Sequence, residues 1–337
     1  MNAKTVKRAV ALLGCGLAAQ LTWAQGSLTP PGAPAPTMKT LNQVEPRIAI
    51  TNLPYTVSTS GSYYVSANLA GTGGINVYAD NVTVDLMGFT LSGNTGGDGV
   101  YTERSGVVVC NGIITRFGVG VQLSNANGCR LQNLVCVSNT YRGIQVSSSS
   151  GNCVGNAIID CTIAANGEAG VYMGSSSSGN CAGNEFNRCV VSDNTSYGFW
   201  LNTQFGGGLS VGNRILDCVV TRNGAYGIEL TASSLGQSFG HLITGCTVTK
   251  NTARGIDIDS SGGNRIENNT CQYQTGATTY GIRTANCASN LVVRNLCSGH
   301  TSNFWLDTDD TYGPIVTTIG ALGTTGADAH PWANFSR

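Results

Sequence analysis

Charged side chains are scarce in this sequence, at 11% of its 337 residues, whereas an ordinary globular domain carries about 25%. Beyond the first 25 residues only two lysines remain, Lys39 and Lys250, and the formal net charge is +0. A nucleic-acid partner is therefore not expected, because affinity for phosphate chains needs a basic surface. Disorder is not expected either, since 41% of the residues are hydrophobic and they recur at regular spacing.

Long apolar runs are missing after the N-terminus. The first residues combine a basic start with an apolar core and small residues before position 25. This pattern predicts a secretory signal peptide over 1–24, and hence a secreted, periplasmic or cell-envelope protein. The apolar run is shorter than the ~20 residues that a membrane span needs. Cys15, which follows Leu-Leu-Gly, gives a second interpretation as a lipoprotein, and 25–37, rich in Pro, Gly and Ala, is expected to be a linker.

A repeat dominates the rest of the chain. The segment Ile158–Met173 reads IIDCTIAANGEAGVYM, and its pattern recurs from Phe186, Ile215 and Ile243. The glycine before the second predicted strand returns every 21 to 29 residues, at Gly99, Gly120, Gly143, Gly170, Gly198, Gly227, Gly255 and Gly281. Glycine and β-branched residues dominate and no 3.6-residue period occurs, so the copies predict strands. Each copy is therefore expected to be one coil of an all-β, single-stranded parallel solenoid.

Stacking of the coils at about 4.8 Å would align equivalent residues in columns. Two apolar columns, starting at Val121 and Leu123, predict the core. A third column places side-chain amides at a turn, where they can bond from coil to coil; it contains Asn139, Asn166, Asn194, Asn223 and Asn251. We expect an N-terminal cap and first strands over 38–80, with a short helix within 38–50. The coils should follow over 81–306 and a C-terminal cap over 307–337.

Twelve cysteines remain once Cys15 is removed with the leader, and a secreted chain normally pairs its cysteines. Four of them share one slot of the repeat: Cys161, Cys189, Cys218 and Cys246. The preceding copy carries Leu134 there, so this slot belongs to the core and buried thiols are expected. Cys153 and Cys181 lie in identical SSSSGNC loops and could meet one coil apart, so a cross-link there stays open. Zinc is not expected, because no C-x-x-C pair or nearby His accompanies them.

With these features the sequence resembles the right-handed parallel β-helix superfamily, with its pectate-lyase-like and NosD-like repeat proteins. The resemblance rests on the Gly-apolar-x-apolar strands, the asparagine column and the entry GSYYVSANL … NVTVDLMGFTLSG over Gly61–Gly93. The closing YGPIV … PWANF is similar to the end of secreted bacterial β-helix proteins without an assigned activity. The resemblance implies polysaccharide lyases, glycoside hydrolases, epimerases or adhesins. No Gly-His-Gly, adjacent Asp pair on a coil strand or Arg-x-Lys carries a lyase or polygalacturonase motif over to this chain.

One outward-facing column is rich in aromatic side chains, although aromatic residues make up only 7% of the chain. It lies beside the glycine of each coil. Exposed rings suit stacking on the apolar face of a sugar. The predicted substrate-binding residues are Tyr172, Trp200, Tyr197, Tyr226 and Arg254.

The same column places Glu229 and Asp257 one coil apart. Their carboxyl groups would lie ~5 Å from each other, as in a retaining glycosidase, and like charges at that distance raise one pKa. Together with Arg283 they are the predicted catalytic residues; in a lyase, Arg283 or Tyr226 would be the base. A Ca²⁺ site using Glu229, Asp257 and Asp259 is the competing use of these oxygens, and a solvated salt-bridge ladder is the structural alternative.

Three functions follow from these patterns, because fold alone does not fix function. The first is a secreted protein that binds and cleaves an acidic polysaccharide, as a lyase or glycoside hydrolase. The second uses the same face for binding without catalysis. The third is a structural or adhesive cell-envelope protein. The sequence does not set the oligomeric state.

Overall fold

The computed structural model describes residues 45–203, 207–233, 237–317, 325–327 and 329–337. The predicted signal peptide over 1–24 and linker over 25–37 lie outside these residues. The chain divides into two compact units, Met1–Pro46 and Arg47–Arg337. The strands of the described residues lie in the second unit, which is described below.

The described residues form strands, turns and bends, and no helix occurs among them. The described residues therefore contain no helix that is long and apolar enough to cross a membrane. The predicted short helix within 38–50 does not occur in 45–50, where the chain is extended from Ile48 onward. The rest of that segment lies outside the described residues. Ile48–Ile50 pairs in parallel with Gly61–Val65, so its backbone groups are satisfied by a neighbouring coil.

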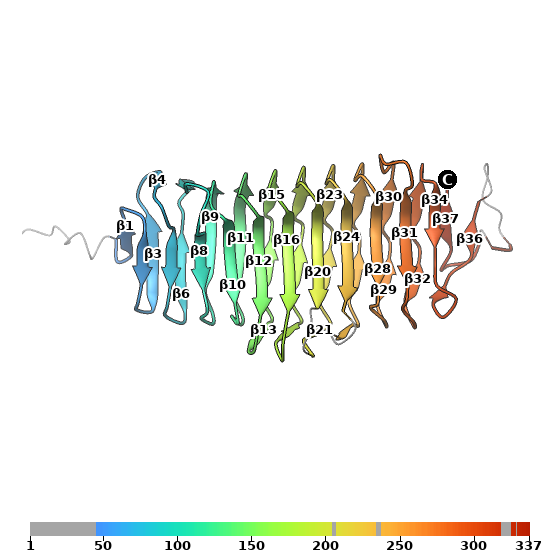
Figure 1. Ribbon diagram of the computed structural model, residues 1–337, viewed down its shortest axis with the longest axis horizontal. Coiled ribbons are helices and arrows are strands. Elements are labelled where there is room, and N and C mark those ends of the chain that lie inside the picture. The colour runs from blue at the N-terminus through green and yellow to red at the C-terminus, as the bar shows by residue number, and fades with distance from the viewer. Residues whose placement is uncertain (1–44, 204–206, 234–236, 318–324, 328) are drawn as a thin grey trace, which may run out of the picture. The chain divides into compact units, whose positions relative to one another are not determined.

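The strands stack into a parallel solenoid (Figure 1). Eleven of them form one sheet, here called the front sheet: β2 (Tyr55–Val57), β5 (Ile75–Val77), β8 (Asp98–Thr102), β10 (Val119–Ser124), β12 (Arg142–Ser148), β16 (Ala169–Ser175), β20 (Tyr197–Thr203), β24 (Tyr226–Ala232), β28 (Arg254–Asp259), β31 (Tyr280–Ala285) and β34 (Ser302–Trp305). A 4-stranded sheet extends four coils beyond the front sheet: β13 (Asn152–Val154), β17 (Asn180–Ala182), β21 (Leu209–Val211) and β25 (Gln237–Phe239).

The remaining 22 strands form the third sheet. They are β1 (Ile48–Ile50), β3 (Gly61–Val65), β4 (Leu69–Ala70), β6 (Val82–Asp85), β7 (Thr90–Ser92), β9 (Val108–Thr115), β11 (Arg130–Val137), β14 (Ala157–Ile159), β15 (Thr162–Ala164), β18 (Glu185–Asn187), β19 (Val190–Ser192), β22 (Arg214–Leu216), β23 (Val219–Thr221), β26 (Leu242–Thr244), β27 (Thr247–Thr249), β29 (Arg265–Glu267), β30 (Thr270–Gln272), β32 (Leu291–Val293), β33 (Leu296–Ser298), β35 (Thr311–Tyr312), β36 (Ile315–Val316) and β37 (Asn334–Ser336). Two strands are continuous: β9 pairs with both β6 and β7 of the preceding coil, and β11 pairs with both β14 and β15 of the following coil. The neighbouring coils on both sides therefore have two short strands where these two coils have one long strand.

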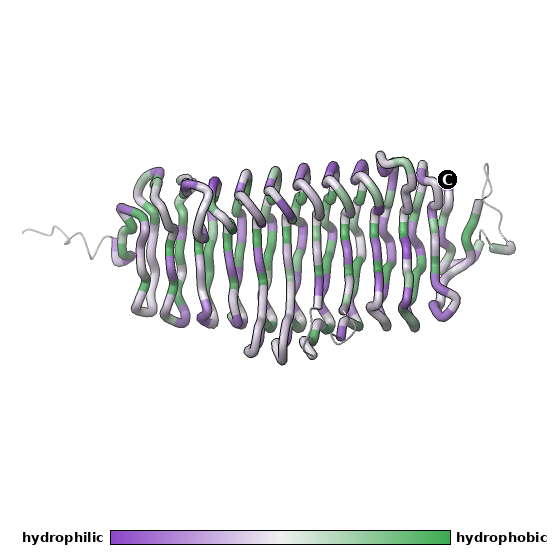
Figure 2. Tube along the Cα trace, viewed as in Figure 1, coloured by the Kyte–Doolittle hydropathy of each residue, from purple (hydrophilic) through white to green (hydrophobic). Residues whose placement is uncertain are grey.

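Alternation of apolar and polar residues turns one side of every strand inward (Figure 2). The predicted inner columns are confirmed: Val121 pairs with Ile144, and Leu123 with Val146, and all four are fully buried. Glycine is required at the start of the front-sheet strands because no room exists there for a side chain. A Cβ on Gly198 would lie 2.5 Å from the Gly227 carbonyl oxygen of the next coil, closer than a Cβ can approach.

Buried asparagines tie the coils together at the turns. The predicted column is confirmed, because Asn166 Nδ2 donates to Asn194 Oδ1 at 2.9 Å and Asn194 Nδ2 donates to Asn223 Oδ1 at 2.9 Å. Two further ladders were not predicted. One contains Asn156, Asn184, Asn213, His241, Asn264, Asn290 and Asp310. The other contains Asn269, Asn295 and Asn334.

The cysteine column lies inside, as predicted. Its four thiols are at most 1% exposed, and the twelve cysteines in the described part of the chain are free thiols. Cys153 and Cys181 are register partners and fully buried, yet also unlinked. The Cys246 backbone N–H donates to Asn269 Oδ1, so the asparagines of the last ladder continue the column that the cysteines begin.

Candidate functional site

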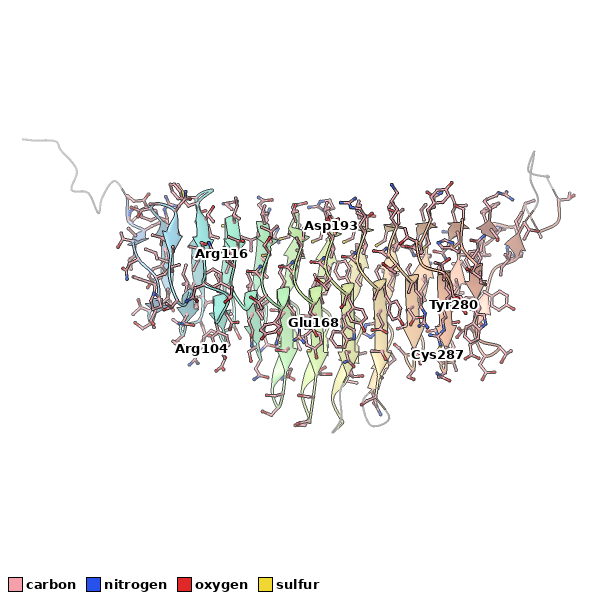
Figure 3. All side chains as sticks on the ribbon, turned by 45° about the horizontal axis from the view of Figure 1, so that its top comes forward. Arg104, Arg116, Glu168, Asp193, Tyr280 and Cys287 are labelled. Carbon is pink, nitrogen blue, oxygen red and sulfur yellow. The ribbon has the colours of Figure 1, made fainter. Side chains whose placement is uncertain are left out.

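The outward side chains of the front sheet form one continuous row, here called the front face. Strand register aligns Tyr172 with Trp200, Trp200 with Glu229, Glu229 with Asp257, and Asp257 with Arg283. The structure thus brings the predicted site residues together, one coil after another. Figure 3 shows side chains along this side of the solenoid, with Glu168 near its middle and Tyr280 toward its C-terminal end.

The aromatic half of the front face is packed against itself. Tyr197 stacks on Trp200 with ring centroids 4.7 Å apart, while Tyr172 meets Trp200 edge-on at 5.1 Å and Tyr226 meets Tyr197 edge-on at 5.7 Å. The Arg142 guanidinium lies 3.8 Å from the centre of the Tyr172 ring. Tyr172 is therefore only 6% exposed, in contrast to the expected open row. The rings of Trp200, Tyr197 and Tyr226 are half-buried and keep part of their surface in solvent.

Two arginines hold the charged half together. Asp257 is fully buried; its carboxylate accepts from Arg254 Nη1 at 2.6 Å and from Arg283 Nη1 at 3.0 Å. Arg283 also donates to Asp259 at 3.1 Å. Burial raises the pKa of Asp257, although the two guanidinium groups act against this effect. Their charge-assisted hydrogen bonds favour the ionised form of the carboxyl group. Burial also acts to raise the pKa of Asp259, but hydrogen bonds from Asn286 and Arg283 outweigh it and hold that pKa below its usual value.

Glu229 differs from its neighbours. The carboxyl group is half-buried beside Asp257, and no hydrogen bond or ion pair to it occurs within the described residues. Burial and the Asp257 charge raise the pKa of Glu229 to about 7, although Arg254 acts against them. Burial and the Glu229 charge likewise raise the pKa of Tyr197 to about 12, and burial raises the pKa of Tyr226. Both tyrosines therefore remain proton donors at neutral pH.

This pKa predicts how stability changes with pH. An unfolded glutamate titrates near pH 4.3, so the folded state holds an extra proton on Glu229 between about pH 4 and pH 7. The stability from this proton is complete below pH 4 and is lost as the pH rises through 7. The Glu229→Gln variant should therefore melt above wild type at pH 8, with the difference closing toward pH 4. Parallel melting curves at all pH values would contradict the raised pKa.

The charged cluster gives no support for calcium. Among the described residues, no group of three or more His, Cys, Asp or Glu side chains is placed to hold a metal ion. Asp257, the central predicted ligand, is instead occupied by Arg254 and Arg283, and positive charge at that point opposes cation binding. The predicted Ca²⁺ at Asp257 and Asp259 is therefore not supported.

Two family models match the chain. One is described as a right handed beta helix region and matches residues 58–214. The other is described as periplasmic copper-binding protein (NosD) and matches residues 187–313. Copper favours imidazole, thiolate and thioether ligands. In the described part of the second match, His241 is enclosed by Asn213 and Ser238, and the thiols other than the half-buried Cys287 lie in the core. No group of three or more His, Cys, Asp or Glu side chains among the described residues is placed to hold a metal ion. The described residues do not fit a copper site.

No curated protein matches the sequence, but solved structures do. The Dettilon tailspike protein has a TM-score of 0.60 at 13% identity, with 86% of this chain and 60% of the tailspike covered. The periplasmic alginate epimerase AlgG has a TM-score of 0.56 at 12% identity, covering 83% of this chain and 75% of that one. The A-module of the Azotobacter vinelandii mannuronan C-5 epimerase AlgE6 has a TM-score of 0.53 at 14% identity, covering 84% and 83%.

These likenesses are too distant to transfer an activity and show the fold alone. The chain spans about 60% of the tailspike's length. The family models match overlapping segments from residue 58 to residue 313, which contain most coils of the parallel solenoid. The chain therefore belongs to the right-handed parallel β-helix superfamily.

Proposed function

We propose that this protein is a secreted or periplasmic β-helix protein that binds a polysaccharide along the front face and cleaves it by proton transfer at Glu229. The Glu229 carboxyl carries the proposal, because its pKa is about 7 and it lies beside the ionised Asp257. A general acid or base is most effective when its pKa is near the working pH. Two neighbouring carboxyl groups with separated pKa values are the usual arrangement for acid–base work.

The roles of the two carboxyl groups differ in this proposal. Glu229 keeps exposed surface and gives or takes the proton. Asp257 has no exposed surface and its oxygens are held by Arg254 and Arg283, so it acts as a positioning residue whose charge keeps Glu229 protonated. Asp257 is consequently not a nucleophile here. Arg283 is likewise not the base, because the carboxylates of Asp257 and Asp259 raise its pKa despite its burial.

The surroundings of Glu229 support a sugar ligand. Trp200 and Tyr197 present a flat, half-buried aromatic surface one coil away, and such surfaces stack on sugar rings. With Glu229 protonated, Arg254 and Arg283 balance Asp257 and Asp259, so no net negative charge repels an acidic chain. Two structural neighbours with this fold are named as alginate and mannuronan epimerases, and their names indicate that they act on polysaccharides.

A panel of uronate-containing and neutral polysaccharides tests the proposal, with and without Ca²⁺. New reducing ends alone would indicate hydrolysis, and unsaturated ends would indicate elimination. The Trp200→Ala variant should lose glycan retention while it remains folded at the assay temperature. Its melting temperature should fall, because the indole ring packs on Tyr197 and Tyr172. Full retention by this variant would contradict the binding role of the aromatic surface.

A non-catalytic structural or adhesive protein is the second candidate. It is favoured by the self-packed rings of Tyr172, Trp200 and Tyr197 and by the continuous asparagine ladders. The packed rings and the asparagine ladders would both make a spacer rigid. Such a spacer would not require a titrating carboxyl group. If no glycan of the panel is retained or cleaved, this candidate replaces the first.

A further inference from the structure

The front face continues beyond the charged cluster toward the C-terminal end of the solenoid. Strand register aligns Asp257 on β28 with Arg283 on β31, and Arg283 with Trp305 on β34, the last strand of the front sheet. Trp305 is 48% exposed, which makes it the most exposed tryptophan in the described part of the chain. The front face therefore carries a second indole ring, on the opposite side of Glu229 from Trp200.

Two neighbouring side chains hold the Trp305 ring in place. The Arg283 guanidinium lies 5.2 Å from the centre of the ring, and the Tyr280 ring meets it edge-on with centroids 6.4 Å apart. Arg283 is fixed in turn by ion pairs with Asp257 at 3.0 Å and with Asp259 at 3.1 Å. A side chain that is already held by its neighbours loses little freedom when a ligand stacks on it. Trp305 is therefore exposed and oriented before any ligand binds.

The arrangement of the two tryptophans indicates the kind of ligand. Trp200 and Trp305 belong to the same column of register partners, with Glu229 between them. A small aromatic molecule would need only one of these rings, whereas two rings in one line suit a ligand with repeated units. Each indole face suits the apolar face of a sugar ring. A chain of sugar units satisfies both conditions.

Strand spacing gives the length of chain that such a ligand needs. Trp200 lies one coil before Glu229 and Trp305 lies three coils after it. At about 4.8 Å per coil, these steps are about 5 Å and about 14 Å, so the two rings are about 19 Å apart. We propose that Trp305 is a second sugar-binding position, and that one polysaccharide chain contacts both tryptophans and passes Glu229 at an internal unit. This inference rests on the proposed function.

Sugar-binding positions on both sides of Glu229 predict that the chain is cleaved internally. Hydrolysis consumes one water for each glycosidic bond broken, whereas elimination consumes none and leaves a double bond in one product. In both reactions, the flanking binding positions set which bond lies at Glu229. The viscosity of a polysaccharide solution should therefore fall early in the reaction, and the first products should be longer than disaccharides.

Binding titrations test the inference with size-fractionated oligosaccharides of alginate, polygalacturonate, xylan and glucan, from disaccharide to octasaccharide. Wild-type affinity should rise at the length that reaches from Trp200 to Trp305, about 19 Å. Trp305→Ala should weaken binding of oligosaccharides above that length by about 3- to 10-fold, the effect of one lost aromatic contact. Trp305→Tyr should keep most of the affinity, because it retains an aromatic face. Melting curves show whether each variant is folded at the assay temperature.

Trp332→Ala is the matched control. Trp332 is also exposed, at 40%, and also has an arginine against its ring, since the Arg294 guanidinium lies 4.2 Å from the ring centre. It belongs to the C-terminal tail near β32, outside the front sheet. The control should bind all oligosaccharides like wild type.

The possible outcomes separate this inference from the proposed function. If wild type binds long oligosaccharides and folded Trp305→Ala binds them equally well, Trp305 is not a binding position and the proposed function stands. The same holds if wild-type affinity does not rise with length, or if only monosaccharides and disaccharides are released first. Equal losses in Trp305→Ala and Trp332→Ala would also contradict a specific role for Trp305. Failure of wild type to bind any oligosaccharide would overturn both proposals.

Discussion

Replacing Glu229 by glutamine is expected to lower the turnover of polysaccharide cleavage by about 10²- to 10⁴-fold, the usual contribution of a general acid or base. This loss corresponds to about 3–5 kcal/mol of the activation barrier. Glutamine keeps the shape of the side chain but cannot transfer the proton. Ligand affinity should change little, because Glu229 makes no hydrogen bond or ion pair with the described residues that the change would break. Initial rates of end-group formation measure the effect.

A matched control separates chemistry from folding. Glu185 forms a surface ion pair with Arg214 at 3.3 Å on the opposite sheet, so Glu185→Gln should leave turnover unchanged. Glu229→Gln should also be at least as stable as wild type at pH 8, because it removes a carboxylate that burial disfavours. Retention of full turnover by a folded Glu229→Gln protein would exclude Glu229 as the proton-transfer residue.

The coil structure could be predicted because each element of the pattern has one physical reason. A period of two places one side of a strand in the core, and the repeat length sets which residues stack. Register pairs such as Val121 with Ile144 and Glu229 with Asp257 therefore follow from the positions of the glycines. The predicted register is well determined, because the same spacing of glycine and apolar residues recurs in every coil.

The chemistry of the site could be predicted only in part. Sequence spacing placed Glu229 beside Asp257, but not which carboxyl group would be buried. That depends on the long side chains of Arg254 and Arg283, which reach Asp257 from three residues away and from the next coil. The covering of Tyr172 by Arg142 has the same cause. A long, flexible side chain can reach several neighbouring residues, and the repeat pattern alone does not determine which of them it contacts.

The asparagine ladder that begins at Asn156 could have been predicted from a pattern in the sequence. Gly155-Asn156, Gly183-Asn184, Gly212-Asn213 and Gly263-Asn264 repeat a Gly-Asn pair at each return to the third sheet. These glycines have positive φ, between 59° and 66°, which a glycine adopts at low cost. The pair therefore marks a turn followed by an inward amide. His241, after Gly240, interrupts the pattern in sequence while continuing it in space.

The largest loss of stability is expected from Asn194→Ala, in the middle of the first ladder. Asn194 Oδ1 accepts from both the backbone N–H and the side chain of Asn166, and its Nδ2 donates to the Ile163 carbonyl oxygen at 3.3 Å. Alanine would remove these three hydrogen bonds at a residue that is 1% exposed, although the Asn166 amide would keep its bond to the Cys136 carbonyl oxygen. Each unsatisfied buried group costs about 1–3 kcal/mol, so the free energy of unfolding should fall by about 4 kcal/mol. Urea unfolding followed by circular dichroism measures it.

The ladder predicts more than a local loss, because each amide orients the next. Without Asn194, the amide of Asn166 loses its acceptor on one side and Asn223 loses a donor on the other, so adjacent coils should become more open to hydrogen exchange than distant ones. Asn187→Ala is the control: its side chain bonds Glu185 on the surface at 3.0 Å, and such changes stay within about 0.5 kcal/mol. If both variants unfold at the same urea concentration, the amide ladder does not stabilise the solenoid. Its stability would then come from the apolar columns, and the asparagines would serve only to shape the turns.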